Sequence, residues 1–123
     1  MQTTLSAEME ASVLNKFVEF PSVDMTKARL VTELVQGSPW GATQLTVYGS
    51  TSDKGSKFFV VTGAPTPSTE GITAEFDIGS IRRLRVVVSI AGAAGVIIRV
   101  YACLSNPSIT GSPTPPTNFA TRS

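Results

Sequence analysis

The residues best suited to chemistry are Glu75 and Asp77, two carboxylates that alternate onto the same face of a predicted strand. Such a pair could bind a cation or act as an acid pair. It could equally be a solvated strand face or supply partners for arginines. The chain has no histidine and a single cysteine, Cys103, so a zinc site and Ser-His or Cys-His nucleophiles are not expected. We therefore expect a protein that is not an enzyme and binds no metal or other cofactor.

Aromatic side chains offer a second chemistry, because exposed rings can stack on sugars. The candidates are Trp40, Tyr48 and Tyr101. Trp40 follows Pro39 and precedes Gly41 in a predicted loop, where its indole could contact a ligand, cover the core or anchor an interface. Cys103 alternates to the outside of the last predicted strand, and we expect a partly buried, inert thiol.

Four arginines lie in the most apolar part of the chain, SIRRLRVVVSIAGAAGVIIRVYACL at 80–104. The Ala-Gly segment 91–95 predicts a hairpin in which Ile90 pairs with Val96. This register makes one face entirely apolar, with Leu84, Val86, Val88, Ile90, Val96, Ile98, Val100 and Ala102. The opposite face then carries Arg83, Arg85, Val87, Ile97, Arg99 and Tyr101, together with Ser89 and Cys103.

The composition of that outer face has two interpretations. Arginine and tyrosine among aliphatic side chains form a composition enriched at protein interfaces, which favours a contact with another subunit. Alternatively, carboxylates on neighbouring strands pair with the arginines inside the molecule, and the candidates are Glu33, Glu75 and Asp77.

Composition sets the class of protein. The 123 residues suit one domain, with 41% hydrophobic against 15% charged residues and abundant Gly, Pro, Ser and Thr. The formal charge of +1 provides no global field for nucleic acid or an anionic membrane. Neither a secretion signal nor a membrane span is apparent, so we expect no membrane partner.

The elements that must position these residues are short strands with alternating apolar residues, separated by Gly, Pro, Ser and Asp clusters. We expect an all-β antiparallel sandwich or barrel with about seven strands, and of the two we favour the sandwich. They are predicted at 13–20, 28–36, 43–50, 57–62, 72–78, 81–90 and 96–104. A turn at 52–55 joins the third to the fourth as a hairpin. The fifth places Ile72, Ala74, Phe76 and Ile78 on its buried face.

Extended ends flank this domain, which we place at 12–105. The amino-terminal arm, 1–11, is left without a secondary structure. The carboxy-terminal arm, 106–123, contains four prolines among Ser, Thr, Gly and Asn, so it is unsuited to a helix or a central strand. It is either a disordered terminus or an arm that orders against a partner through Phe119.

The segments TVYGSTSDKGSKFFVV, ITAEFDIGSIRRLRVVVS and GVIIRVYACLS, within 43–105, resemble small β-sandwich proteins of bacteriophage virions, of the capsid decoration or cement type. The resemblance implies a jelly-roll-like fold, homo-oligomers that are often trimers, and arms that reach neighbouring subunits on a shell. It also implies a viral capsid protein as partner, a place on the virion surface, and synthesis in the host cytoplasm.

Three functions follow as hypotheses. The first is a non-enzymatic virion structural protein that oligomerises and contacts capsid subunits through a sheet face and both arms. The second is a carbohydrate-binding module that uses Trp40 with Tyr48 or Tyr101. The third is a nucleic-acid binder that uses the arginines; we expect no nucleic acid, and such binding would weaken steeply with salt.

Overall fold

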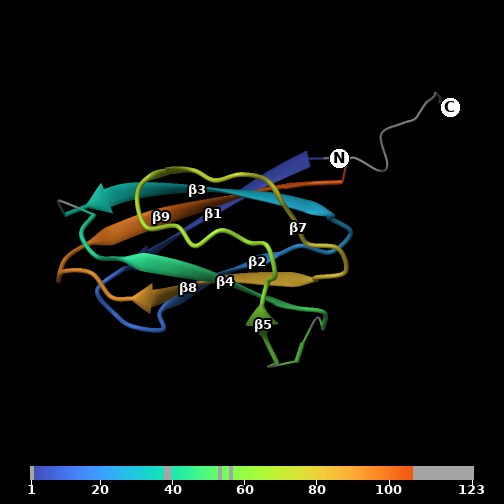
Figure 1. The fold of residues 1–123 in the computed structure, drawn as a ribbon, viewed down its shortest axis with the longest axis horizontal. Coiled ribbons are helices and arrows are strands. Elements are labelled where there is room, and N and C mark those ends of the chain that lie inside the picture. The colour runs from blue at the N-terminus through green and yellow to red at the C-terminus, as the bar shows by residue number, and fades with distance from the viewer. Residues whose placement is uncertain (1, 38–39, 53, 56, 107–123) are drawn as a thin grey trace, which may run out of the picture.

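The protein is a sandwich of two antiparallel β-sheets. The computed structural model describes residues 2–37, 40–52, 54–55 and 57–106. All the secondary-structure elements in this part of the chain are β-strands, and they form two layers (Figure 1). The prediction of an all-β antiparallel sandwich is confirmed.

Each layer draws its strands from distant parts of the sequence. Sheet A has the order β1-β9-β3-β6, with β7 also paired to β3. Its strands are β1 (Gln2–Glu10), β3 (Lys27–Gln36), β6 (Gly71–Ile72), β7 (Phe76–Asp77) and β9 (Ile97–Ser105). Sheet B has the order β2-β8-β4-β5. Its strands are β2 (Phe17–Pro21), β4 (Gln44–Ser50), β5 (Phe59–Val60) and β8 (Arg83–Ile90).

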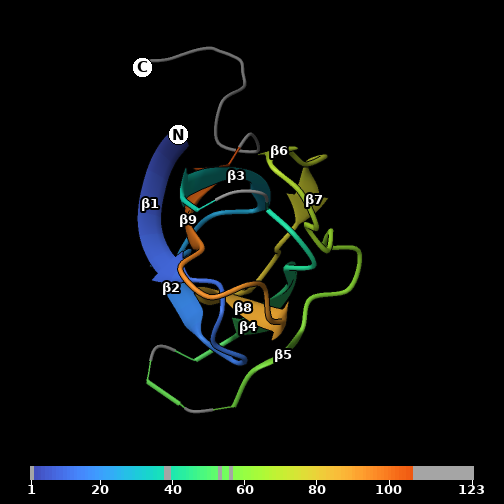
Figure 2. The same ribbon diagram turned by 90° about the vertical axis from the view of Figure 1, so that its left-hand side faces the viewer.

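The pairing is nested. The first strand pairs with the last, β2 with β8, β3 with β6 and β7, and β4 with β5, which is the arrangement of a jelly roll. Most consecutive strands therefore cross from one sheet to the other. Figure 2 shows the two layers end on, with β1 and β2 at one side and β6 and β7 at the other.

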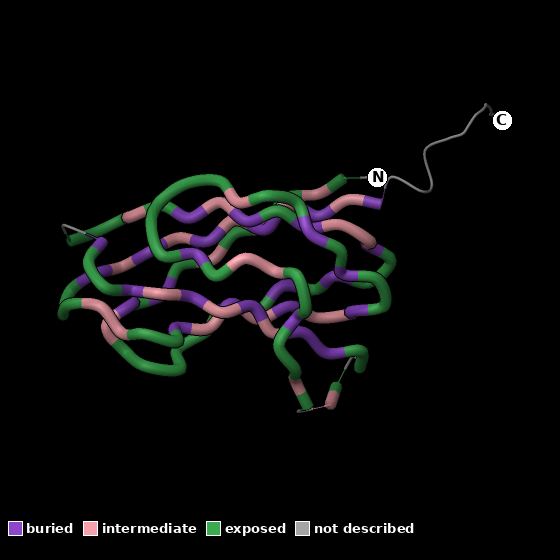
Figure 3. Tube along the Cα trace, in the orientation of Figure 1, coloured by how far each residue is buried: buried purple, intermediate pink, exposed green. Residues whose placement is uncertain are grey.

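The core lies between the layers because each long strand turns alternate apolar residues inward. Figure 3 shows this alternation as buried positions that recur along the strands. The largest fully buried hydrophobic side chains come from both sheets and are Leu30, Leu45, Leu84, Ile98, Leu104, Val47, Val86, Val88 and Val100.

The hairpin predicted between Ile90 and Val96 is wrong. β8 pairs with β2 and β4 in sheet B, whereas β9 pairs with β1 and β3 in sheet A. The predicted apolar face is nevertheless buried, except at Ile90, which is 47% exposed at the end of β8. Two strands with matching apolar faces can pack across a sandwich as well as side by side, and here they pack across it.

Several predicted strands are shorter in the structure. β4 and β5 do pair, as predicted for 43–50 and 57–62, but β5 contains only Phe59 and Val60. The predicted strand at 72–78 is divided into β6 and β7. Of its predicted buried face, Phe76 and Ile78 are buried, whereas Ile72 and Ala74 are exposed. Residues 11–16 turn into β2, and Asn15 has a positive φ of 68°.

The segment expected to be an amino-terminal arm forms strand β1. It pairs with β9 without a break from Gln2 to Glu10. Alternation puts Met9 in the core, and Leu5 and Ala7 pack against it. Within the expected carboxy-terminal arm, Asn106 is buried and its side-chain amide donates a 2.7 Å hydrogen bond to the Asp24 carbonyl. The remainder of that arm, with Phe119, lies outside the described residues.

Candidate functional site

The arginines predicted to share one surface lie on the two opposite outer faces of the sandwich. Arg83, Arg85 and Val87 belong to β8 of sheet B, whereas Ile97, Arg99 and Tyr101 belong to β9 of sheet A. The structure thus divides the predicted interface into two surfaces with different chemistry.

On sheet A, Arg99 is held between two carboxylates. The strand register places Glu8 of β1 and Glu33 of β3 directly beside it, one on each side. The guanidinium donates hydrogen bonds to Glu8, and at 3.0 Å to Glu33. Tyr101, whose hydroxyl lies 3.3 Å from both Arg99 and Glu33, closes the cluster. The arginine partner predicted at Glu33 is correct, and Glu8 is an additional one.

These contacts stabilise the charged form of Arg99. The hydrogen bond with Tyr101 and the hydrogen bond and negative charge of Glu8 raise the pKa of Arg99 above its ordinary value. Arg99 forms ion pairs with two carboxylates of its own chain, so its charge needs no partner from another molecule.

On sheet B, Arg85 is stacked between two aromatic rings. Its guanidinium lies 4.1 Å from the centre of the Phe17 ring and 3.8 Å from the centre of the Phe58 ring. Its Nε–H donates a 2.8 Å hydrogen bond to Glu19, the cross-strand neighbour on β2. Stacking and the ion pair together fix a side chain that would otherwise be mobile.

Arg83 uses the same partners and also holds a loop. It lies 3.5 Å from the second carboxylate oxygen of Glu19 and 4.7 Å from the centre of the Phe58 ring. Its guanidinium donates hydrogen bonds to the carbonyls of Ser52, at 2.9 Å, and Gly55. Arg83 thereby ties the connection between β4 and β5 to the sheet.

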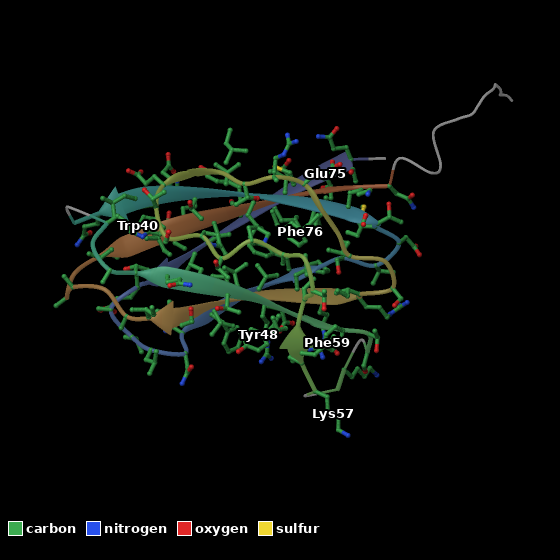
Figure 4. All side chains as sticks on the ribbon, viewed as in Figure 1. Trp40, Tyr48, Lys57, Phe59, Glu75 and Phe76 are labelled. Carbon is green, nitrogen blue, oxygen red and sulfur yellow. The ribbon has the colours of Figure 1, made fainter. Side chains whose placement is uncertain are left out.

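Around Arg85 the outer face of sheet B is aromatic and apolar. Val60 pairs with Tyr48 and so shares its face, and Tyr48 is the cross-strand neighbour of Arg85. We call the following residues the sheet B cluster: Phe17, Tyr48, Phe58, Val60, Arg85 and Val87. Figure 4 shows Tyr48 on the side of sheet B away from sheet A, and Lys57 extending from the body nearby.

A shallow depression opens within this cluster. Its volume is about 330 Å³, and its lining comprises Asn15, Phe17, Tyr48, Phe58, Arg85 and Val87. Phe17 is 42% exposed and Val60 57% exposed, so the rim presents apolar surface to solvent. Of the sites in the described chain, this one combines accessible rings with a positioned charge, which suits it to binding rather than to bond cleavage.

The three aromatic residues predicted as a sugar platform do not form one. Trp40 is 7% exposed, and its indole N–H donates a 2.9 Å hydrogen bond to the Thr43 carbonyl. Figure 4 shows it where the chain crosses from β3 to β4. Trp40 therefore covers the core, whereas Tyr48 and Tyr101 lie on opposite outer faces.

Glu75 and Asp77 have different surroundings. Asp77 forms an ion pair with Lys27, its neighbour across β3 and β7. Glu75 lines a different hollow of about 180 Å³, with Gln2, Arg29, Cys103 and Ser105. Among the residues that the structure describes, no group of three or more His, Cys, Asp or Glu is placed to hold a metal ion.

One prediction about the outer face of β9 is confirmed. Cys103 is a free, half-buried thiol on the outer face of β9. In the described part of the chain no helix is long and apolar enough to cross a membrane.

Sequence reasoning missed Phe17 and Phe58, the residues that hold Arg85. A signal for each was present. Adjacent residues of a strand face opposite sides, so one ring of the Phe58-Phe59 pair had to face outward. Similarly, burial of Val18 and Phe20 forces Phe17 and Glu19 to the outer face.

Comparisons of the chain with protein-family models, with curated proteins and with solved structures found no match.

Proposed function

We propose that this protein is a non-enzymatic structural component of a virion, of the capsid decoration or cement type. It binds shell subunits through the outer face of sheet B and acts as an oligomer. The observation that carries the proposal is the sheet B cluster, an exposed aromatic and aliphatic surface built around a fixed arginine.

The chemistry of this surface favours a protein partner. Aromatic residues and arginine are enriched in the contact regions of protein interfaces, and rigid rings bury area with little loss of conformational freedom. Phe17 and Phe58 are held by Arg85 before any partner arrives. A surface ordered in advance loses less entropy on binding.

The same geometry argues against nucleic acid as the partner. Phosphate binding needs cations that are free to replace counterions. On sheet B, Glu19 forms ion pairs with both Arg83 and Arg85. On sheet A, Glu8 and Glu33 both pair with Arg99. Recognition by these faces therefore relies on apolar contact.

Two observations direct the proposal toward a viral shell. The nested strand order is that of a jelly roll, an architecture that serves viral capsid and lectin domains. The sequence of the body also resembles small virion sandwich proteins. The protein would act on the virion surface after synthesis in the host cytoplasm. The contact expected from 107–123 stays a prediction.

Density-gradient sedimentation of the tagged full chain with lysate from its native source tests this function. We expect the chain to travel with shell-sized particles. Val60→Ser should return it to the top of the gradient, because this valine is 57% exposed within the cluster. Val35→Ser is the matched control, since Val35 is 42% exposed on β3 of sheet A. Failure of the wild-type chain to sediment with particles, or equal loss in both variants, contradicts the proposal.

The depression supports a carbohydrate as a second candidate ligand. Phe17, Tyr48 and Phe58 offer rings around a hollow of about 330 Å³, and of these three Tyr48 was predicted for this role. A glycan array is the test. Binding that Phe17→Ser abolishes would support a sugar site, and silence across the array would remove it.

A further inference from the structure

Along its whole length, strand β1 has one edge that pairs with no other strand of the described chain. Its register with β9 continues into Ala11, whose N–H donates a 2.8 Å hydrogen bond to the Val96 carbonyl. Backbone groups alternate in an antiparallel pair, so the odd-numbered residues of β1 face β9. The even-numbered residues direct their N–H and C=O groups away from the sheet; they are Gln2, Thr4, Ser6, Glu8 and Glu10.

The opposite edge of sheet A is closed. Leu30 exchanges hydrogen bonds with Thr73 through the Thr73 hydroxyl at 3.1 Å and the Thr73 N–H at 2.9 Å. At the next open position the Leu34 N–H is capped by the Glu70 carboxylate at 2.8 Å. Proteins commonly block sheet edges in such ways, because an open edge is a template for strand pairing. β1 is the edge strand of sheet A without this protection, at the end of the order of the described strands.

The inner side of β1 is also incompletely covered. Leu5 and Ala7 pack on the core but stay half-buried, whereas their neighbours on β9, Val100 and Ala102, are fully buried. Figure 2 shows β1 running along the rim of the sandwich. In the described chain, the edge of β1 therefore has backbone N–H and C=O groups without a strand partner, and apolar side chains that are partly exposed.

We propose that β1 pairs with β1 of a second copy of this chain, antiparallel and about a two-fold axis at Ser6. Two copies of sheet A then become one continuous sheet. Ser6 faces Ser6 of the second copy, Thr4 faces its Glu8, and Gln2 faces its Glu10. The proposed function includes an oligomer, and this inference identifies that oligomer as a dimer formed through β1. It rests on no other part of the proposed function.

The axis at Ser6 is the one that pairs all five outward-facing residues of β1 with one another, and it also keeps like charges apart. Centring the axis on Ser6 places each carboxylate opposite a neutral polar residue, Thr4 or Gln2, whereas an axis at Glu8 would put Glu8 opposite itself. Like charges directly opposite each other destabilise a sheet. On the inner side the same register sets Leu5 against Ala7 of the second copy, which covers the apolar surface that sheet B leaves open.

The mass of the full chain in solution is the first test. We expect about twice the chain mass of 12.9 kDa by light scattering. A monomer at all concentrations, or a trimer, overturns the inference. If a monomer still travels with shells, the shell binding of the proposed function stands, while its oligomeric part and this inference both fail. A dimer that does not travel with shells supports this inference and contradicts the shell binding.

Variants at the edge provide the second test. Ser6→Pro removes an N–H that points away from β9, so we expect a monomer with the emission of buried Trp40 unchanged. Ser6→Thr keeps the N–H and should stay dimeric. A dimeric Ser6→Pro protein overturns the proposal.

Should Ser6→Pro fail to fold, the register can be tested without proline. In a Cys103→Ser background, Ser6→Cys should form a disulfide-linked dimer on oxidation, and Thr4→Cys should not. Thr4→Lys, placed opposite Glu8, should tighten the dimer, while Thr4→Glu should weaken it. The reverse order of the two Thr4 variants, or equal cross-linking at both positions, overturns the register.

Discussion

The Arg85 guanidinium lies 3.8 Å from the centre of the Phe58 ring on the outer face of sheet B. Phe58 comes from the segment just before β5, and Arg85 lies near the start of β8, an inner strand of the sheet. The contact therefore joins the edge of sheet B to its centre, and with Phe17 it gives the sheet B cluster its shape.

Replacing Phe58 by leucine should destabilise the protein modestly. Leucine keeps most of the apolar volume but removes the ring face that attracts the guanidinium. We expect a loss of about 0.5–1 kcal/mol in the free energy of unfolding by urea titration. Phe59→Leu is the control, because no arginine of the described residues lies over that ring, and it should change the value by less than about 0.5 kcal/mol. Equal effects would contradict the stacking account.

Replacing Glu19 by a neutral residue should remove the ion pairs of both Arg83 and Arg85. Glu19→Gln removes ion pairs with Arg83 and Arg85 whose partly exposed side chains limit their strength. We expect a loss of about 0.5–1 kcal/mol at low salt that shrinks at high salt, because screening weakens the wild-type pairs. The variant should also bind nucleic acid more strongly in a filter assay. A salt-independent loss would show that packing, rather than charge, is responsible.

Gly49 marks a tight position in the core. A Cβ added there would lie 2.9 Å from Cδ1 of Ile81 and 3.0 Å from Cγ2 of Val61. Gly49→Ala forces these side chains to move, and overpacking of this kind typically destabilises by about 1–3 kcal/mol. Gly55→Ala, which meets only the exposed Ser52 side chain, should have a much smaller effect. Thermal unfolding followed by Trp40 emission measures both, and a neutral Gly49→Ala would contradict the packing described.

Because of the Lys27–Asp77 pair, a small part of the free energy of unfolding changes with pH in the alkaline range. The hydrogen bond and charge of Asp77 raise the pKa of Lys27 above its ordinary value of 10.5. The folded state therefore holds the proton more tightly than the unfolded state. The contribution is fully present below about pH 10.5 and is lost as pH rises through the higher folded pKa.

We therefore expect the stability difference between wild type and Lys27→Met to be constant from neutral pH to about pH 10 and to shrink above it. Urea titrations across this range measure the difference. Lys16→Met is the control, because no ion pair of Lys16 is seen in the described chain. A difference that grows with pH contradicts the pairing.

Alternation in the sequence predicts which side chains are buried, but not which strands are neighbours. Leu84, Val86, Ile98 and Val100 were placed in the core correctly. Their strands were paired wrongly, because an inward-facing apolar row fits a hairpin and a facing sheet equally well. Long-range pairings such as β1 with β9 leave no local signal, so the sequence does not distinguish β1 from an extended arm.

The candidate site was found in part. Arg85 was predicted on an outer face, and Glu33 was named as a partner for the arginines. Glu8, Glu19, Phe17 and Phe58 were missed, because their roles depend on cross-strand neighbours that only the topology supplies. Trp40 depends on a local contact instead. The sequence places it in a loop but does not show that its indole N–H donates to the Thr43 carbonyl, which holds the ring in the core.

The two tyrosines of the chain provide the most direct test of the account, because Tyr48 lies in the sheet B cluster and Tyr101 on the outer face of sheet A. Both are half-buried, so a tyrosine-specific reagent read out by mass spectrometry can compare them in free and shell-bound protein. The account predicts that shell binding protects Tyr48 and leaves the labelling of Tyr101 unchanged. Protection of Tyr101 with Tyr48 still reactive would contradict it.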